Sequence, residues 1–230
     1  MQVPVEDADA VVHLAAIAHR RASREELQRV NVDLAVETAR KAAGAGAGFV
    51  FLSSVKVHGE TSTAALRETS PIAPRDDYAA SKAKAEDALR AVPGLRLAVL
   101  RPPLVYGPGV KANFLSLLKA VARGVPLPLA SVDNRRSLVY VGNLAAAILA
   151  CLDRQGTFLV SDGPAVSTPQ LCREIGAALG RPARLFAFPP AWLPRKLSGS
   201  LEVEDSTLSW KRPFTRQEGL RTTARWYLGL

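Results

Sequence analysis

Phe49-Val50-Phe51-Leu52-Ser53-Ser54, at residues 49–54, is the stretch that decides the fold class of this chain. Four apolar residues are followed by two hydroxyl residues, a pattern typical of a strand that is buried on both faces and ends at a site. Similar apolar runs lie at residues 10–15, 95–100, 138–141 and 157–160. Helical patterns separate most of these runs, so we predict an α/β protein with a parallel sheet covered on both faces.

The predicted helices run over residues 25–43, 78–92, 113–123, 144–152 and 170–179. Ser167 or Thr168 fits the N-cap of the last helix, and Pro169 fits its first position. Beyond residue 181 the sequence is rich in Pro, Arg and Trp, and there we expect short elements only.

Composition excludes several classes of protein. No apolar run reaches the roughly 18 residues of a membrane span, and the N-terminus lacks the basic start of a secretory signal. The two cysteines, Cys151 and Cys172, lack metal-ligand spacing and indicate buried thiols in a reducing compartment, so we expect a cytoplasmic protein without a metal site. The formal charge of +9 comes from scattered arginines, which argues against nucleic-acid binding and suits an anionic substrate.

The motif Tyr78-Ala79-Ala80-Ser81-Lys82 carries the candidate chemistry. Residues four apart on a helix lie on one face, so the Lys82 ammonium is expected beside the Tyr78 phenol. A nearby cation favours the phenolate, and Tyr78 is therefore predicted to have a lowered pKa and to act as a general acid/base. Ser54 follows a predicted strand at the sheet edge where α/β proteins bind ligands, and it could share a proton with Tyr78.

Four further stretches accompany this motif: HLAA at 13–16, SSVKVHGE at 53–60, LRPPLVYGPG at 100–109 and RRSLVYVGNLA at 135–145. Together with the motif, they resemble the extended short-chain dehydrogenase/reductases, the NAD-dependent epimerase/dehydratase family. The likeness covers nearly the whole chain and is greatest to UDP-glucose 4-epimerases and 4-keto-sugar-nucleotide reductases of polysaccharide synthesis. It implies a Rossmann-like doubly wound sheet. We therefore expect a truncated dinucleotide-binding and catalytic domain over residues 1–155, and a small C-terminal α/β substrate lobe over 156–230, interleaved with 105–135.

The resemblance also implies roles for individual residues. Tyr78 would be the catalytic acid/base, Lys82 would lower its pKa and hold the nicotinamide ribose, and Ser54 would complete the triad. The substrate would contact Ser54, Asn113 and Arg136, the last because a guanidinium fork pairs with a diphosphate. The cofactor, NAD or NADP, would be bound by Leu14, Ala15, Ala16, Asn31, Ser53, Tyr78, Lys82, Arg101 and Pro102.

Departures from the family pattern restrict the reactions that the sequence predicts. The glycine-rich turn that binds the cofactor pyrophosphate is missing, so we expect a fragment or mis-started reading frame, with a naturally reduced protein as the alternative. Val55 and Lys56 stand where sugar 4,6-dehydratases have an Asp-Glu pair, which argues against elimination. His58 stands where Tyr is common and is expected to be a packing residue, and Leu104 replaces an Asn of many UDP-galactose epimerases.

The sequence favours an NAD(P)-dependent nucleotide-sugar C4 epimerase similar to UDP-glucose 4-epimerases. The alternatives are an NAD(P)H-dependent 4-keto-6-deoxy sugar-nucleotide reductase and a truncated, non-catalytic sugar-nucleotide-binding protein. The expected partner is a nucleotide sugar, UDP-linked, with no nucleic acid and no membrane span. A homodimer through helices of the catalytic domain is a further expectation.

Overall fold

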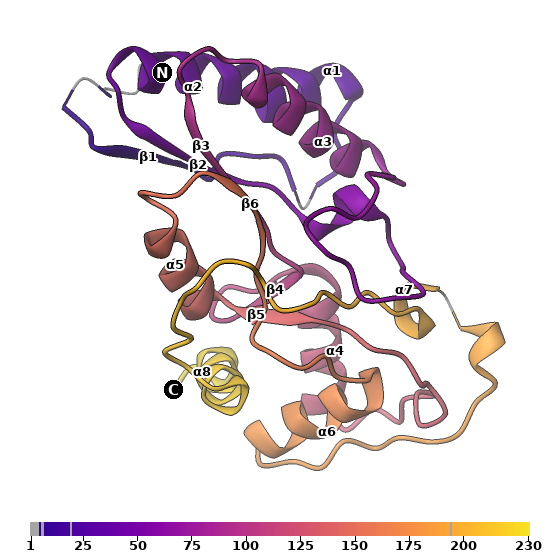
Figure 1. Ribbon diagram of the computed structural model, residues 1–230. Coiled ribbons are helices and arrows are strands. Elements are labelled where there is room, and N and C mark those ends of the chain that lie inside the picture. Colours follow the sequence, from indigo (N-terminus) through magenta and orange to yellow (C-terminus); the bar gives the residue numbers. More distant parts are fainter. Residues whose placement is uncertain (1–4, 6, 19, 194) are drawn as a thin grey trace.

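The computed structural model describes residues 5, 7–18, 20–193 and 195–230, and its framework is a four-stranded parallel sheet (Figure 1). The strand order is β1-β2-β3-β6. In register, His13 pairs with Phe51, Leu52 with Leu100, and Arg101 with Leu159. The strands are β1 (Ala10–His13), β2 (Gly48–Leu52), β3 (Arg96–Arg101) and β6 (Gly156–Leu159).

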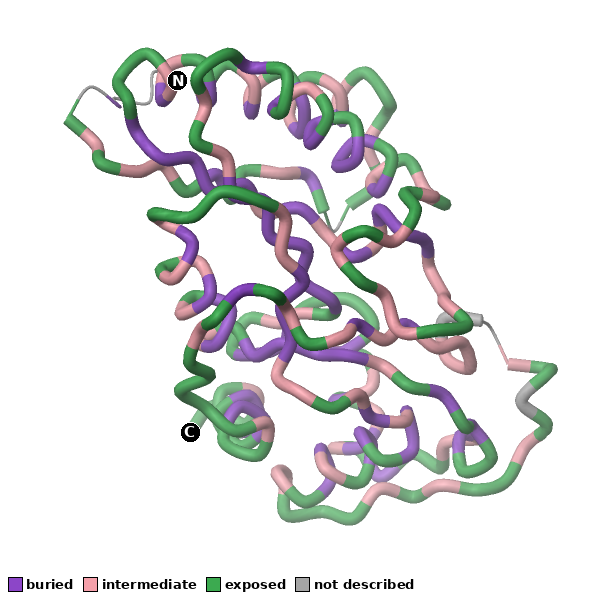
Figure 2. Tube along the Cα trace, in the orientation of Figure 1, coloured by how far each residue is buried: buried purple, intermediate pink, exposed green. Residues whose placement is uncertain are grey.

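Helices cover both faces of this sheet because its strands carry apolar side chains on both sides. One face packs Phe49 and Phe51 against α2 (Leu34–Gly44) and α3 (Asp77–Arg90). The other face packs Val50 and Leu100 against α5 (Val141–Ala150). The buried parts of the two central strands, β2 and β3, lie between these helical layers in Figure 2.

A second core lies below the sheet in Figure 1 and includes a two-stranded parallel sheet of β4 (Leu104–Tyr106) and β5 (Leu138–Tyr140). Tyr106 and Tyr140 of these strands pack with apolar residues of the surrounding helices. The helices are α4 (Ala112–Ala122), α6 (Thr168–Ala178) and α8 (Arg216–Leu228). Shorter elements are η2 (Val55–His58), η3 (Pro190–Trp192) and α7 (Arg195–Ser198).

The predicted α/β class with a parallel sheet is confirmed, and the predicted helices are present within a few residues of their expected ends. Ser167 is the N-cap of α6, where its hydroxyl accepts a hydrogen bond from the Gln170 amide. One expectation was wrong, and one strand was not predicted. Residues beyond 181 include α8, a helix of 13 residues, and residues 104–106 form a strand that the sequence analysis missed.

The predicted domain boundary after residue 155 does not separate the larger sheet from the rest of the chain. Strand β6 follows that position but pairs with β3 in the larger sheet. The division into two domains stays a prediction. The expectation about a secretory signal at the N-terminus involves residues 1–4, which lie outside the described residues, and it also stays a prediction. None of the helices in the part of the chain that the structure describes is long and apolar enough to cross a membrane. Cys151 and Cys172 are buried free thiols, and burial raises the pKa of each to about 11.

Candidate active site

The carboxyl ends of β1, β2 and β3 bring most of the predicted site residues to one edge of the sheet. Residues 14–16 follow β1, Ser53 and Ser54 follow β2, and Arg101 is the last residue of β3. Because the strands are parallel and adjacent, these three ends meet at the same edge. Such an edge is where open α/β sheets bind their ligands.

Tyr78 lies in the first turn of α3 and faces Ser54. Asp76 caps this helix by accepting a hydrogen bond of 2.7 Å from the Ala79 amide. The Ser54 side chain forms a hydrogen bond with Tyr78, and it also accepts one of 3.2 Å from the Lys56 amide. The predicted pairing of Ser54 with Tyr78 is therefore present.

The pKa of Tyr78 moves in the direction opposite to our prediction. Burial, and after it the negative charge of Asp76, raise the pKa of the phenol to about 12, and the Ser54 hydrogen bond opposes both. The Lys82 ammonium, which we expected to lower the pKa of Tyr78, does not contribute to this shift. In this geometry the phenol is protonated at neutral pH.

Lys82 is almost completely buried one turn after Tyr78, with 2% of its surface exposed. Its ammonium donates a hydrogen bond of 2.8 Å to the Leu52 carbonyl and lies 4.5 Å from the centre of the Phe51 ring. Burial lowers the pKa of Lys82 to about 8, and the negative charge of Glu86 opposes this shift. These bonds explain the missing effect on Tyr78, because the ammonium is held against the end of β2.

His13 provides a test of whether a dinucleotide fits at the end of β1. Its ring is 5% exposed and stacks on Phe49 and Phe51, yet its Nε2 atom has no hydrogen-bond partner among the described residues. The next residues, Leu14 and Ala15, are exposed and the second is small. A buried polar atom without a partner beside an open, small-residue segment and Lys82 suits a bound polar cofactor.

Asn31 shapes the segment after β1 rather than facing solvent. It lies in a π-helical turn, η1 (Gln28–Asp33), between α1 (Arg24–Leu27) and α2. Its side chain accepts a hydrogen bond from the Ile17 amide (2.8 Å) and donates to the Ile17 carbonyl (3.2 Å) and to Ser81 (2.9 Å). Asn31 therefore fixes the end of residues 14–17 against α3.

Three other predicted cofactor residues make contacts within the protein. The Ser53 hydroxyl and the Arg101 guanidinium both bind the buried carboxylate of Glu86. The Pro102 carbonyl accepts a hydrogen bond of 3.0 Å from the Val55 amide. The sequence analysis missed Glu86, although its position four residues after Lys82 on a helix was a usable signal.

The loop after Ser54 carries a cation where a dehydratase would have an acid. Lys56 donates a hydrogen bond of 2.7 Å to Asp76 and lies 3.7 Å from Glu60. His58 is buried, and its ring bonds to Pro71 and Arg101, so it belongs to a polar network inside the protein. No group of three or more potential metal ligands occurs in the described residues.

The two predicted substrate residues of the second core lie on different elements. Asn113 is exposed in the first turn of α4, whose N-cap is Lys111, and the preceding Ala112 has a positive φ of 53°. Such a backbone is strained in a residue other than glycine and is frequent at functional sites. Arg136 is half-buried just before β5, and its pKa is lowered by burial and raised by Glu60. This coupling to Glu60 puts Arg136 near the loop that follows Ser54.

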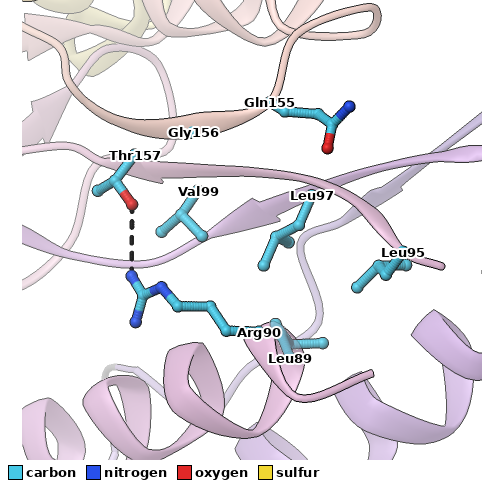
Figure 3. Close-up of a pocket in the computed structure, with 8 residues that line it drawn as sticks. All are labelled: Leu89, Arg90, Leu95, Leu97, Val99, Gln155, Gly156 and Thr157. Carbon is cyan, nitrogen blue, oxygen red and sulfur yellow. Dashed lines mark hydrogen bonds between the residues drawn. The ribbon is translucent and has the colours of Figure 1, made fainter. Parts of the chain in front are cut away.

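A pocket of about 260 Å³ lies away from these residues, near the amino ends of β3 and β6 (Figure 3). Arg90 crosses it and donates a hydrogen bond of 3.3 Å to Thr157. Because the catalytic candidates lie at the carboxyl ends of the strands, this pocket is not part of their site. It is lined by Leu89, Arg90, Leu95, Leu97, Val99, Gln155, Gly156 and Thr157.

A parallel sheet whose strand ends bring together a serine, a hydrogen-bonded tyrosine and a buried lysine defines a dinucleotide-dependent enzyme of the oxidoreductase type. Residues 2–160 match the NAD dependent epimerase/dehydratase family. The chain belongs to this family.

Curated relatives agree with this assignment. The UDP-glucose 4-epimerase of Vibrio cholerae is 38% identical over 99% of this chain and 79% of its own length. A ceramide reductase of Caulobacter vibrioides is 36% identical over 62% of this chain and 40% of its own length. The GDP-6-deoxy-D-mannose reductase of Pseudomonas aeruginosa is 28% identical over 93% of this chain and 78% of its own length.

Solved structures share the fold. The UDP-N-acetylglucosamine 4-epimerase of Bacillus cereus superposes with a TM-score of 0.81 at 20% identity, covering 96% of this chain and 80% of that one. The Bordetella bronchiseptica enzyme WbmG, solved in complex with NAD, gives a TM-score of 0.79 at 20% identity over 96% of this chain and 72% of that one.

Proposed function

We propose that the chain is an NAD(P)-dependent C4 epimerase of a UDP-linked hexose, similar to UDP-glucose 4-epimerases. The observation that carries the proposal is the Ser54–Tyr78 hydrogen bond at the carboxyl edge of a parallel sheet, with Lys82 one helical turn away. The 38% identity to the Vibrio cholerae UDP-glucose 4-epimerase over 99% of the chain supports the substrate class.

The proposed mechanism assigns one task to each residue. The phenolate form of Tyr78, a minor fraction at neutral pH, takes the proton of the sugar 4-hydroxyl and returns it, and Ser54 stabilises this phenolate before the first transfer and after the second. Lys82 and the segment Leu14–Ala16 would hold the nicotinamide dinucleotide, with Asn31 fixing that segment. The cofactor, when bound, supplies the hydride acceptor and donor. Val55 and Lys56 offer no carboxylic acid to protonate a departing 6-hydroxyl, which argues against elimination.

The second core would bind the nucleotide. Arg136 is proposed to pair with the diphosphate, because its planar fork matches two phosphate oxygens, and Asn113 to contact the substrate beside it. Residues 156–230, interleaved with 105–135, would form the substrate lobe. We also propose a homodimer through helices of the catalytic domain. A molecular mass from light scattering that stays at one chain at micromolar concentration would exclude the dimer.

The test is interconversion of UDP-glucose and UDP-galactose by the purified chain with added NAD. We expect conversion without net cofactor reduction, and a loss of about 10²–10⁴-fold in kcat for Tyr78→Phe, because general acid/base catalysis is worth that much. Arg75→Gln, an exposed change three residues away, is the control for preparation effects. The epimerase proposal fails if the folded wild-type chain binds NAD but converts neither sugar.

A second candidate, the 4-keto-6-deoxy sugar-nucleotide reductase, is favoured by one specific observation. A phenol whose pKa is raised to about 12 is protonated at neutral pH, and such a group is ready to donate a proton to a reduced C4 oxygen. The 28% identity to the GDP-6-deoxy-D-mannose reductase is compatible with this reaction. Stoichiometric oxidation of NADH or NADPH by a 4-keto-6-deoxy sugar nucleotide would select the reductase.

A further inference from the structure

Glu86 is a carboxylate of α3 that the mechanism above does not use, and it is buried to 1% exposure. Its Oε1 atom accepts hydrogen bonds from the Ser53 hydroxyl (2.6 Å) and Arg101 Nε (3.0 Å). Its Oε2 atom accepts from Arg101 Nη2 (2.5 Å) and Arg90 Nη2 (2.7 Å). Both oxygens are therefore bonded, and the Arg101 contact has the bidentate geometry of a strong ion pair.

Arg101 extends these contacts to the loop that follows Ser54. Its Nη1 atom lies 3.0 Å from His58 Nε2 and 3.2 Å from the Glu68 carbonyl. His58 Nδ1 lies 3.0 Å from the Pro71 carbonyl, which can only accept a hydrogen bond. The network therefore assigns the proton to Nδ1, so that Nε2 accepts from Arg101 and the ring is neutral.

The Glu86 network joins every element that presents a catalytic candidate. Glu86 itself lies on α3, four residues after Lys82; Ser53 is adjacent to Ser54; and Arg101 ends β3 and reaches η2 through His58. A buried ion pair adds little net stability compared with apolar residues of the same volume, because desolvation offsets the attraction. Its value here lies in fixing the relative positions of these elements.

We propose that Glu86 is a positioning residue of the active site, whose buried carboxylate ties α3, and with it Lys82, to the ends of β2 and β3. The catalytic part of this proposal rests on the proposed function. The effect on Lys82 does not, because it is a property of the chain without substrate.

The charges around Lys82 support this role. The Lys82 ammonium donates to the Leu52 carbonyl and lies 4.5 Å from the centre of the Phe51 ring. Its charge interacts with two titratable groups: Glu86, four residues later on the same helix, and His13 at the end of β1. Burial lowers the pKa of Lys82 to about 8, and Glu86 is the negative charge that counters burial. His13, whose pKa is lowered to about 4, is neutral over the same pH range. Loss of the Glu86 charge should therefore move the Lys82 titration to lower pH.

The test compares the full-length chain with Glu86→Gln, which keeps the shape of the side chain and removes its charge. The Lys82 titration is followed by NMR of the chain carrying ¹³Cε-labelled lysine, with the signal assigned by its loss in Lys82→Arg. We expect a midpoint near pH 8 in the wild type and a clearly lower midpoint in Glu86→Gln. Asp87→Asn is the matched control, because it removes a charge from the next, exposed position of α3 and should leave the midpoint unchanged.

Activity gives the second measurement. If the chain is an epimerase, Glu86→Gln should lower kcat by about 10–10²-fold, a size typical of small errors in catalytic geometry, and should move the pH profile of kcat/KM with the Lys82 titration. If the wild type has no epimerase activity but Glu86→Gln still lowers the Lys82 midpoint, the proposed function is overturned and the role of Glu86 remains. A folded Glu86→Gln chain with an unmoved Lys82 midpoint would overturn the Glu86 role.

Glu86→Gln leaves Arg101 buried without its partner, which is the costly way to break an ion pair. If this variant does not fold, Glu86→Gln combined with Arg101→Met removes both buried charges, and its Lys82 midpoint should again be lower than in the wild type. An unmoved midpoint in the double variant, or failure of both variants to fold, would make Glu86 a stability residue only and overturn the positioning role.

Discussion

At the scale of single residues, Ser54 lowers the proton affinity of Tyr78. Among the described residues, its hydrogen bond opposes burial, which is the largest influence, and Asp76, both of which raise the Tyr78 pKa. We expect Ser54→Ala to raise this pKa further, to reduce the phenolate fraction at every pH below it, and to lower kcat by about tenfold or more. The pH profile of kcat should move toward alkaline pH. The control is Ser70→Ala, a serine in an exposed turn, and an equal loss in both variants would contradict the role of Ser54.

His13 makes stability depend on pH with a definite sign. Burial lowers its pKa to about 4 in the folded chain, whereas an unfolded histidine titrates near 6.5, so protons bind preferentially to the unfolded state between these values. Stability is therefore full above about pH 6.5 and is lost as the pH falls toward 4. Linkage gives a loss of about 2 kcal/mol between pH 7.5 and pH 5.

The contribution of His13 to the unfolding free energy can be measured by urea unfolding of the wild type and of His13→Gln at pH 7.5 and pH 5. The variant cannot take up the proton, so its loss of unfolding free energy between the two pH values should be smaller by about 2 kcal/mol. Other titrating groups, including His58, contribute equally to both proteins and cancel in the comparison. Identical pH dependence in the two proteins would show that His13 is not the group responsible.

Residue-level prediction placed Ser54, Tyr78 and Lys82 near one edge of the sheet, because Tyr78 and Lys82 share a helix and Ser54 follows a strand that ends there. The spacing along α3 did not predict that the Lys82 ammonium bonds to the Leu52 carbonyl instead of acting on the phenol. The raised pKa of Tyr78 could not be expected, because it depends on Asp76 and on burial in three dimensions. The pairing of Arg101 with Glu86 could not be expected either, because the two residues lie 15 positions apart on different elements, and the role of Arg101 at the cofactor stays a prediction.

At the scale of elements, α8 is the helix that the sequence analysis missed. Its segment Arg216–Leu228 is mostly polar and contains a glycine, so it lacks the apolar period of a buried helix. Its start did carry a signal, because Thr215 and Glu218 form a capping box. Strand β4 was missed for another reason, since three residues are too few for a periodic pattern. The π-helical turn at Gln28–Asp33 has no sequence signature at all.

Gly219 shows why α8 tolerates a weak helix former. A Cβ atom at this position would lie 2.8 Å from the Tyr106 hydroxyl and 2.8 Å from the Tyr140 ring, both buried in the second core. Gly219→Ala should therefore lower the unfolding free energy by roughly 1–3 kcal/mol through overpacking, although alanine favours helices.

Chemical denaturation of Gly219→Ala and of Thr222→Ala separates packing from helix propensity. Thr222 is exposed on the same helix, and its replacement by alanine should change stability by less than about 0.5 kcal/mol. A Gly219→Ala protein as stable as the wild type would contradict the close approach of α8 to the two tyrosines.

At the scale of the whole molecule, the candidate site draws on both cores. Ser54, Tyr78 and Lys82 lie at the edge of the larger sheet, whereas Arg136 precedes β5 of the smaller one. Isolated bridges join the two parts, since Leu66 pairs with Val203 and Arg136 pairs with Leu201. The sequence indicated two parts but not these bridges, because they link segments more than 60 residues apart.

If Arg136 binds the diphosphate of a UDP-sugar, nucleotide binding alone should stabilise the chain. UDP at about 100 times its Kd would add about 2.7 kcal/mol of unfolding free energy, which for a chain of this size raises Tm by roughly 5–10 °C. Arg136→Gln should abolish most of this increase, because it removes the fork that matches two phosphate oxygens.

Arg135→Gln is the matched control: Arg135 is the adjacent residue, is exposed, and pairs with Glu202. The measurement is the thermal transition of each protein with and without UDP at fixed salt, and it needs neither turnover nor NAD. Equal stabilisation of all three proteins would mean that UDP binds elsewhere, and the role of Arg136 would then fail while Ser54, Tyr78 and Lys82 kept theirs.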